Sequence, residues 1–343
     1  MFSCVARIGS DKGRPDAAGG FALVVVIVIL LLVSFLASEL ILQVKTELRV
    51  TQNIKSRTVG AFLAEAGVNL GIFRLVDRPA APPAIGNPED YEEFFEGYEY
   101  AVDLPAGRVS YFVASETGKI DLNKSPMPLI EMFVAYHLGG DAAKEEVATV
   151  LDSLLNWRDN DDLHRLSGAE SEAYSALDEP YIARNGNIED PSEFFLIKGT
   201  DKLLGKFHAD EVFTVHNGTG KINFNSLTPA MLDFVTLGNA EAKEAYRAAK
   251  EEFHGVLNQA LAMEIMGEMR YLELQPYLVF ATGNSVYYSV VGTGEAGGEP
   301  EGGATPPVHA GGHERKRPGT RVSVMIRKDA AGFVRLIRRE RYS

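Results

Sequence analysis

The sequence predicts an α+β protein in which a long N-terminal helix packs on an antiparallel sheet and a large helical domain is inserted into that sheet. An apolar stretch that begins at Phe21 continues without proline into an amphipathic stretch that ends near Val76. Alternation of apolar and polar residues, typical of strands, occurs near residues 98–115 and again after residue 285. The region between these two places is rich in helix formers.

Composition limits the classes of function. The chain has 343 residues and a formal net charge of −13, which argues against broad nucleic-acid binding, because such binding uses Lys and Arg to neutralise phosphates. Cys4 is the only cysteine, so no disulfide forms within the chain. No P-loop, nucleophile elbow, HExxH motif or CxxC pair is present, and the seven histidines are scattered. We therefore predict that the protein is not an enzyme.

The N-terminal region predicts a membrane anchor. A polar leader with Arg7, Lys12 and Arg14 precedes the 18 uncharged residues from Phe21 to Ser38. An apolar helix of about 20 residues spans a bilayer. Basic residues before the span keep the N-terminus in the cytoplasm, so the bulk of the chain should be translocated.

The helix should continue beyond the membrane. Apolar residues recur at helical spacings after the span, and no proline intervenes before Val76. They are Leu40, Val44, Leu48, Phe62, Ala66, Leu70 and Phe73. From Phe21 to Val76 such a helix is about 80 Å long. We expect its apolar face after about residue 43 to supply much of the core beneath a globular domain.

A hairpin follows a proline-rich linker. Residues 77–97 hold four prolines and several acidic residues. The sequence then alternates on both sides of Pro105-Ala106-Gly107, which predicts strands near 98–104 and 109–115.

Two similar turns occur about 100 residues apart. "GKIDLNKSP" begins at Gly118 and "GKINFNSLTP" begins at Gly220, and each precedes a helical pattern. Asn123 and Asn225 precede a proline, as at capped helix starts, so we interpret both stretches as helix-capping turns. The alternative is a helix-hairpin-helix-like turn that grips DNA phosphates, but neither turn has a Lys/Arg cluster nearby.

Carboxylates are concentrated between residues 156 and 193, and Ca²⁺ prefers six to eight oxygen ligands on flexible loops. Counted from Asp159, Asp161 and Glu170 occupy the third and twelfth positions of an EF-hand loop, but Leu163 and His164 occupy the fifth and sixth. Spacing alone therefore favours a solvated acidic loop. No His/Cys cluster suggests zinc.

The last third of the sequence predicts helices followed by strands. Residues 240–272 predict one or two helices, with Met263, Met266 and Met269 as core or inter-helix filler. Strands are predicted at 285–292, 321–328 and 332–340, with a Gly/Pro-rich loop after the first. Residues 314–341 hold ten Lys or Arg and three acidic residues. This basic end either blocks aggregation at a sheet edge or contacts anionic lipid or an acidic neighbour subunit.

The N-terminal pattern resembles the type IV pilin class, which combines a charged leader that ends in Gly with Phe, an apolar run and a long amphipathic helix. The resemblance implies that prepilin peptidase cuts between Gly20 and Phe21 and that the new N-terminus is methylated. Most pilins carry Glu at the fifth mature residue, whereas this chain has Val25. This absence resembles the K-type minor pseudopilin of the type II secretion system, which sits at the tip.

The middle of the chain resembles the same family. K-type pseudopilins carry two such turns inside a large helical insertion, and "W-x-D-x-D" followed by "G-A-E" and Tyr174 resembles their calcium-binding loop region. The resemblance implies structural Ca²⁺ held by Asp159, Asp161 and Glu170, with Asp162 and Glu172 as further candidates.

The resemblance also implies a function. The chain is expected to be a single-pass inner-membrane protein with its bulk in the periplasm. It would initiate pseudopilus assembly at the tip, for export of folded proteins across the outer membrane. Its implied partners are other minor pseudopilins in a tip complex, the major pseudopilin and prepilin peptidase, and no nucleic acid. Two alternatives stay open: a tip-located minor pilin of a type IV pilus, and a DNA-binding or uptake protein.

These expectations divide the chain into six segments. They are a leader (1–20), a transmembrane helix (21–42), its amphipathic continuation (43–76), a linker with a pilin-like hairpin (77–118), an inserted helical domain (119–280) and C-terminal pilin-like strands (281–343) with a flexible loop (292–320).

Overall fold

The computed structural model describes residues 18–77, 94–139, 144–281, 285–297, 319–329 and 332–342. Residues 1–17 of the predicted leader, most of the predicted linker and most of the predicted loop at 292–320 lie outside these ranges. The chain divides into two compact units, Met1–Ser56 and Arg57–Ser343, which are described separately.

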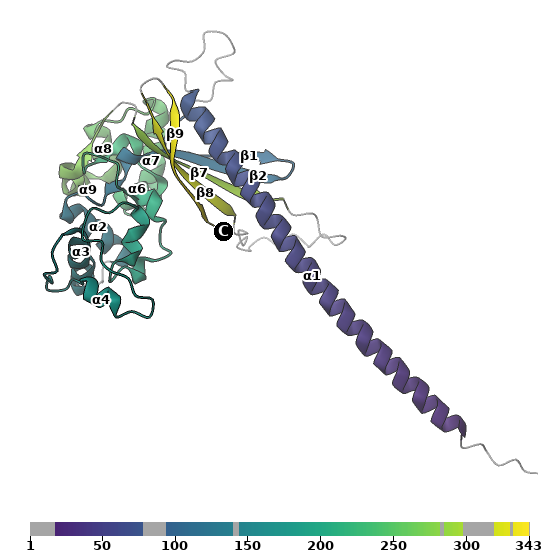
Figure 1. The fold of residues 1–343 in the computed structure, drawn as a ribbon. Coiled ribbons are helices and arrows are strands. Elements are labelled where there is room, and N and C mark those ends of the chain that lie inside the picture. The colour runs from purple at the N-terminus through teal and green to yellow at the C-terminus, as the bar shows by residue number, and fades with distance from the viewer. Residues whose placement is uncertain are drawn as a thin grey trace, which may run out of the picture. The chain divides into compact units, whose positions relative to one another are not determined.

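The predicted long helix is confirmed: α1 runs from Ala18 to Val76 (Figure 1). The expectation that α1 supplies core residues is confirmed, but the expected start near residue 43 is wrong, since Val44 and Leu48 are exposed. Burial begins only near Gly60 and includes Ala64 and Val68.

The predicted antiparallel sheet is also confirmed. Its five strands lie in the order β1-β2-β7-β8-β9, and every pairing is antiparallel. The strands are β1 (Glu99–Leu104), β2 (Gly107–Ser115), β7 (Tyr287–Ala296), β8 (Thr320–Lys328) and β9 (Val334–Tyr342). Strands β2 and β7 are neighbours in the sheet although about 170 residues separate them, so the insertion leaves the sheet after β2 and returns at β7.

Glycines allow α1 to approach the sheet closely. A Cβ atom on Gly292 of β7 would lie 2.1 Å from the Ala64 carbonyl oxygen, and one on Gly294 would lie 2.1 Å from the Gly60 carbonyl oxygen. Real Cβ atoms cannot occupy such positions, so two backbones meet here where most helices and sheets meet through side chains. The side chains buried around this contact are mainly Val and Tyr, including Tyr111, Val113, Tyr288, Val290, Val322 and Val324.

The insertion is mostly helical (Figure 1). Its α-helices are α2 (Met127–Leu138), α3 (Lys144–Arg158), α4 (Ser171–Ser175), α5 (Ala209–Val212), α6 (Pro229–Val235), α7 (Ala240–Glu252), α8 (Gln259–Met266) and α9 (Glu268–Leu274). The 3-10 helices are η2 (Glu116–Gly118), η3 (Pro191–Leu196), η4 (Asp201–Leu203), η5 (Phe224–Ser226) and η6 (Gln275–Tyr277). Short parallel pairs join β3 (Ile120–Asp121) to β4 (Phe213–Thr214) and β5 (Ile222–Asn223) to β6 (Leu278–Val279).

Aromatic side chains dominate the core of the insertion. The Phe133 ring is fully buried, and its centroid lies 5.2 Å from those of Phe207, Phe213 and Phe234, in edge-to-face contacts. This geometry is the favoured one for aromatic pairs.

The C-terminal part of the insertion differs from its prediction. Residues 240–274 form three helices instead of one or two, because the chain takes positive φ angles at His254 (49°), Gly255 (78°) and Gly267 (79°). The interpretation of the methionines as core filler is wrong for Met269, which is 80% exposed, and for Met263, which is also exposed.

The two similar turns pack against each other, and the second also caps helices as predicted: the Thr228 hydroxyl accepts from the Met231 N–H at the start of α6, and the Asn223 side chain caps η5. A Cβ on Gly118 would lie 1.8 Å from the Ser226 carbonyl oxygen, so the backbones are in direct contact. Asn123 exchanges two hydrogen bonds with the backbone of Ile188, and the Asn225 side chain accepts one from the Leu257 N–H. The predicted capping role of both asparagines is therefore wrong: each ties its turn to a distant segment.

Buried ion pairs join the insertion to the sheet. Lys119 donates to Glu116 at 2.5 Å and to the Ser289 hydroxyl of β7 at 2.9 Å. Arg321 of β8 lies 3.1 Å from Asp210 of α5. Burial by itself would raise the pKa of Asp210, but the Arg321 guanidinium, the Ser323 side chain and Lys119 together with His208 offset this, and the pKa is lowered.

Candidate functional site: the apolar helix and the acidic loop

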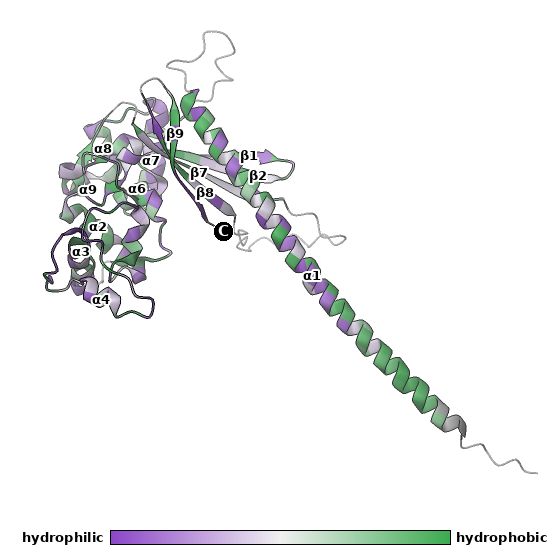
Figure 2. Ribbon diagram, viewed as in Figure 1, coloured by the Kyte–Doolittle hydropathy of each residue, from purple (hydrophilic) through white to green (hydrophobic). Residues whose placement is uncertain are grey.

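The first unit carries an apolar helical surface that nothing in that unit covers. Among the described residues, α1 is the one helix long and apolar enough to cross a membrane by length and composition. Its most apolar window has a mean hydropathy of 2.9, and none of it is buried (Figure 2). A helix that is apolar on all sides needs lipid or other apolar helices around it. The helix is therefore consistent with a single-pass membrane anchor.

The predicted processing site lies at the start of this helix. Gly20 and Phe21 are both within α1, and the Phe21 side chain is exposed. Val25, at the position where most pilins carry Glu, is one turn further along and faces outward from the helix. The cleavage between Gly20 and Phe21 and the tip-specific meaning of Val25 stay predictions.

Aromatic packing anchors the two ends of the acidic loop. The Trp157 ring, at the end of α3, meets Tyr174 of α4 edge to face at 5.2 Å, and Tyr174 stacks on Tyr181 at 5.2 Å. A Cβ on Gly168 would lie 3.0 Å from the Asn156 amide nitrogen, so glycine lets the loop backbone lie close against α3. The Trp, Gly and Tyr of the sequence pattern thus hold residues 159–170 against the insertion.

Four of the five predicted ligands lie on this loop, where Asp159, Asp161 and Asp162 act electrostatically on Glu170. Glu170 is 2% exposed, and neither of its carboxylate oxygens has a hydrogen-bond partner within the described structure. Asp159 is half-buried, and its Oδ1 also has no hydrogen-bond partner among the described residues. Asp161 accepts the Leu163 N–H at 2.9 Å, and Asp162 accepts from the Asn185 amide at 3.5 Å. Glu172 is exposed on α4, and it is not among the charged groups that shift the pKa of Glu170.

The carboxylates repel one another. Burial raises the pKa of Glu170, and the nearby Asp159, Asp162 and Asp161 raise it further. Burial and then Asp161 likewise raise the pKa of Asp159. An uncompensated carboxylate in a buried position is costly, so this arrangement is stabilised by a proton or by a cation.

Asn156 is a polar neighbour that the sequence analysis missed. It is fully buried on α3, and its Oδ1 and Nδ2 both lack partners among the described residues. It lies one helical turn before Asp159 and so shares a helix face with it. The amide oxygen and the carboxylates of Asp159 and Glu170 are the hard oxygen donors that Ca²⁺ takes.

The site is not closed in the form described. Across the ranges that the structure covers, no three His, Cys, Asp or Glu side chains lie close enough together to hold a metal ion as they stand. Binding of Ca²⁺ would therefore require the loop to draw its carboxylates inward around Glu170.

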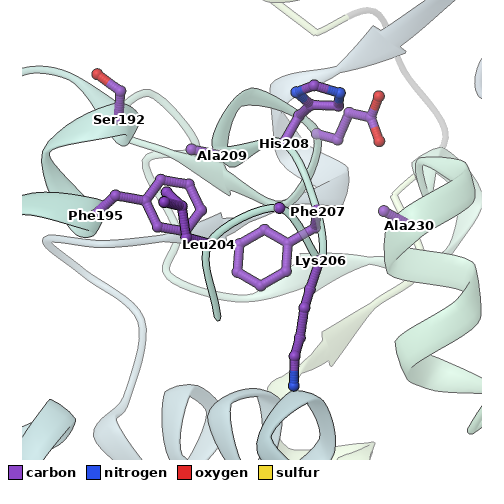
Figure 3. Close-up of a pocket in the computed structure, with 10 residues that line it drawn as sticks. Ser192, Phe195, Leu204, Lys206, Phe207, His208, Ala209 and Ala230 are labelled. Atoms are coloured by element: carbon purple, nitrogen blue, oxygen red, sulfur yellow. The ribbon is translucent and has the colours of Figure 1, made fainter. Parts of the chain in front are cut away.

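A separate pocket of about 410 Å³ lies on the insertion between η3, the segment before α5 and α6 (Figure 3). Phe195, Leu204 and Phe207 give it an apolar wall, and Figure 3 places the Ser192 hydroxyl well away from His208. The Ser192 hydroxyl instead donates to Asp190 at 2.6 Å. This pocket thus pairs no nucleophile with a base.

Comparison with known proteins identifies the region that contains the acidic loop. Residues 136–205 match the family model of type II secretion system protein K. The chain resembles a K-type minor pseudopilin. The match extends from the end of α2 to η4, so it includes all five predicted calcium ligands. The matched family is a structural component of a secretion machine.

Among solved structures, the chain matches the crystal structure of the GspK-GspI-GspJ complex from the enterotoxigenic Escherichia coli type 2 secretion system. It matches at a TM-score of 0.46 and 14% identity, over 88% of this chain and 99% of that chain. No curated protein matches the chain.

Proposed function

We propose that this chain is a non-enzymatic minor pseudopilin at the tip of a type II secretion pseudopilus, where it initiates assembly. The observation that carries the proposal is the match of residues 136–205 to type II secretion system protein K. The uncovered apolar helix supports it, because such a helix serves as an anchor in the inner membrane and later as packing among other subunits. We propose other minor pseudopilins as its first partners, with the bulk of the chain in the periplasm.

Two features support a tip position. Val25 leaves the helix without the carboxylate that would pair with the N-terminal amine of a neighbour below which it docks. The insertion between β2 and β7 adds a large helical body to the side of the sheet, and such a body would obstruct packing within a filament. A subunit at the end of the filament avoids both problems.

We further propose that Ca²⁺ stabilises the acidic loop. Glu170, Asp159 and Asp161 would supply its carboxylates, with Asp162 and the newly identified Asn156 as neighbouring oxygen donors. The support for this is the buried and unpartnered state of Glu170. A bound cation would offset the carboxylate repulsion in a chain that has no disulfide to hold the loop.

The proposal is tested by the intact mass of the full-length protein, expressed in hosts with and without prepilin peptidase and extracted from membranes. We expect a chain that begins with N-methylated Phe21 in the host with the peptidase, and the leader retained in the other host. Gly20→Val should keep the leader in both hosts, because the peptidase requires glycine before the cut in the resembled class, and Gly19→Val serves as the matched control. Retention of residues 1–20 in both hosts would contradict the pseudopilin proposal.

A further inference from the structure

Strand β9 forms one open edge of the five-stranded sheet. It pairs with β8 and with no other strand among the described residues. An edge strand of nine residues presents a row of backbone N–H and C=O groups that can pair with another chain. Apolar side chains accompany this row, since Phe333, Leu336 and Ile337 are all exposed.

The charges on this edge are arginines. Strand β9 contains Arg335, Arg338, Arg339 and Arg341 against one acidic residue, Glu340. Edge strands that only prevent aggregation typically carry lysine, whereas arginine binds carboxylates with a rigid two-pronged donor set. Two of the four already bind carboxylates: Arg338 pairs with Asp190 and Glu340, and Arg339 pairs with Glu65.

The other two arginines are exposed and make no ion pair within the part of the chain that the structure describes. Arg335 lies directly opposite Arg327 of β8 in the antiparallel register, so two positive side chains share one face of the sheet edge. Like charges in this position destabilise a sheet. A carboxylate placed between Arg327 and Arg335 would remove that repulsion.

We propose that β9 is a docking edge for an acidic, extended segment of a partner protein, which adds to the sheet as a sixth strand. Its backbone would pair with the free side of β9, its carboxylates would bind Arg335 and Arg327 on one face of the sheet, and its alternating apolar side chains would cover Leu336 on the other face. Charge complementarity selects an acidic partner. This inference concerns a surface of the second unit and does not depend on the tip role or on calcium.

The test uses the full-length protein in detergent micelles and a fluorescent nine-residue peptide of alternating Glu and Val. We expect saturable binding, seen as a rise in fluorescence anisotropy. A Gln/Val peptide tests the charges, and a Glu/Val peptide with alternate N-methyl groups tests the backbone pairing. Each should bind about tenfold more weakly or worse.

The charge reversal R327E/R335E should weaken Glu/Val peptide binding by about tenfold or more, because each lost arginine removes a charge-assisted bond. The matched control is R108E/K221E, which makes the same change in net charge at two exposed side chains away from β9. Circular dichroism would verify that both variants fold.

Three outcomes would overturn the proposal. The N-methylated peptide could bind as well as its parent, which would leave charge attraction without strand addition. R327E/R335E could bind like R108E/K221E, which would place the peptide elsewhere. The protein could fail to bind the peptide but bind vesicles of phosphatidylglycerol, and R327E/R335E could abolish the vesicle binding. That result would assign the arginines to a lipid surface.

Discussion

The sheet and the helical insertion form two cores that are built by different means. Between α1 and the sheet, the backbones of Ala64 and Gly292 approach so closely that a single methyl group at residue 292 has no room. In the insertion, the side chains fill the space, and Phe133 alone packs on three other phenylalanine rings. The sheet core therefore tolerates no added atoms, and the helical core tolerates no removed ones.

This difference matters for how the chain carries its functions. The sheet core holds one helix against five strands with little adjustable volume, as suits a support for a long anchor. The helical core encloses polar groups, such as Glu170 and Asn156, that lack hydrogen-bond partners among the described residues.

The largest expected effect is the loss of a ring from the helical core. Phe133→Ala should lower the free energy of unfolding by about 4 kcal/mol, because a cavity replaces three edge-to-face contacts. Chemical unfolding of the full-length protein in detergent, followed by the fluorescence of Trp157, measures it. Trp157 is the only tryptophan and lies in the same core. Phe62→Ala is the control, since Phe62 is 69% exposed on α1. A loss below about 1 kcal/mol for Phe133→Ala would break the comparison of the two cores.

The next largest effect is the addition of one methyl group to the sheet core. Gly292→Ala should lower the unfolding free energy by about 3 kcal/mol, since the new Cβ would press on the Ala64 carbonyl oxygen and one backbone must shift. Thermal unfolding by circular dichroism measures this change. In Gly186→Ala the nearest atom to the new Cβ is 3.9 Å away, so that variant should unfold like the parent. Equal stability of the two variants would contradict the close helix–sheet contact.

The smallest expected effect is the removal of a buried charge from the acidic loop of the helical core. Glu170→Gln should raise the unfolding free energy in EDTA at pH 7 by about 1–2 kcal/mol, because it removes a buried charge without a partner. Calcium should then stabilise the parent, by about 2.7 kcal/mol at a hundred times its dissociation constant, but not the variant. Glu172→Gln is the matched control on the neighbouring exposed helix face. Calcium stabilisation that survives Glu170→Gln would remove Glu170 from the site.

The pH dependence of the unfolding free energy provides an independent check on the Glu170→Gln prediction. Burial raises the pKa of Glu170 above its ordinary value of 4.5, so the folded state binds the proton more tightly than the unfolded state. That stabilisation is complete below pH 4.5 and is lost as the pH rises through the folded-state pKa. The advantage of Glu170→Gln in EDTA should therefore grow as the pH increases from there. Burial lowers the pKa of His137 to about 4, which acts in the opposite direction but equally in both proteins, so the His137 contribution cancels in the difference.

Local patterns in the sequence were sufficient to predict individual helices and strands. The absence of proline from Phe21 to Val76 and the alternation on both sides of Pro105-Ala106-Gly107 predicted α1 and the β1–β2 hairpin. These features depend on spacing along the chain, since a helix and a hairpin repeat their side-chain directions over a few residues. The acidic residues and the Trp, Gly and Tyr around them likewise marked the loop before its geometry was known.

Only the tertiary structure decided what those elements contact. The spacing of Val44 and Leu48 suits a buried helix face, yet the buried residues of α1 begin near Gly60, where glycines of β7 over 200 residues away permit a close approach of the sheet. The sequence suggests Asn225 as a helix cap, but its side chain bonds to Leu257. Asn156 carries no sequence signal, and it becomes buried only because α3 and the loop backbone at Gly168 enclose it. Backbone contact, register and burial depend on residues distant in sequence, and no local period records them.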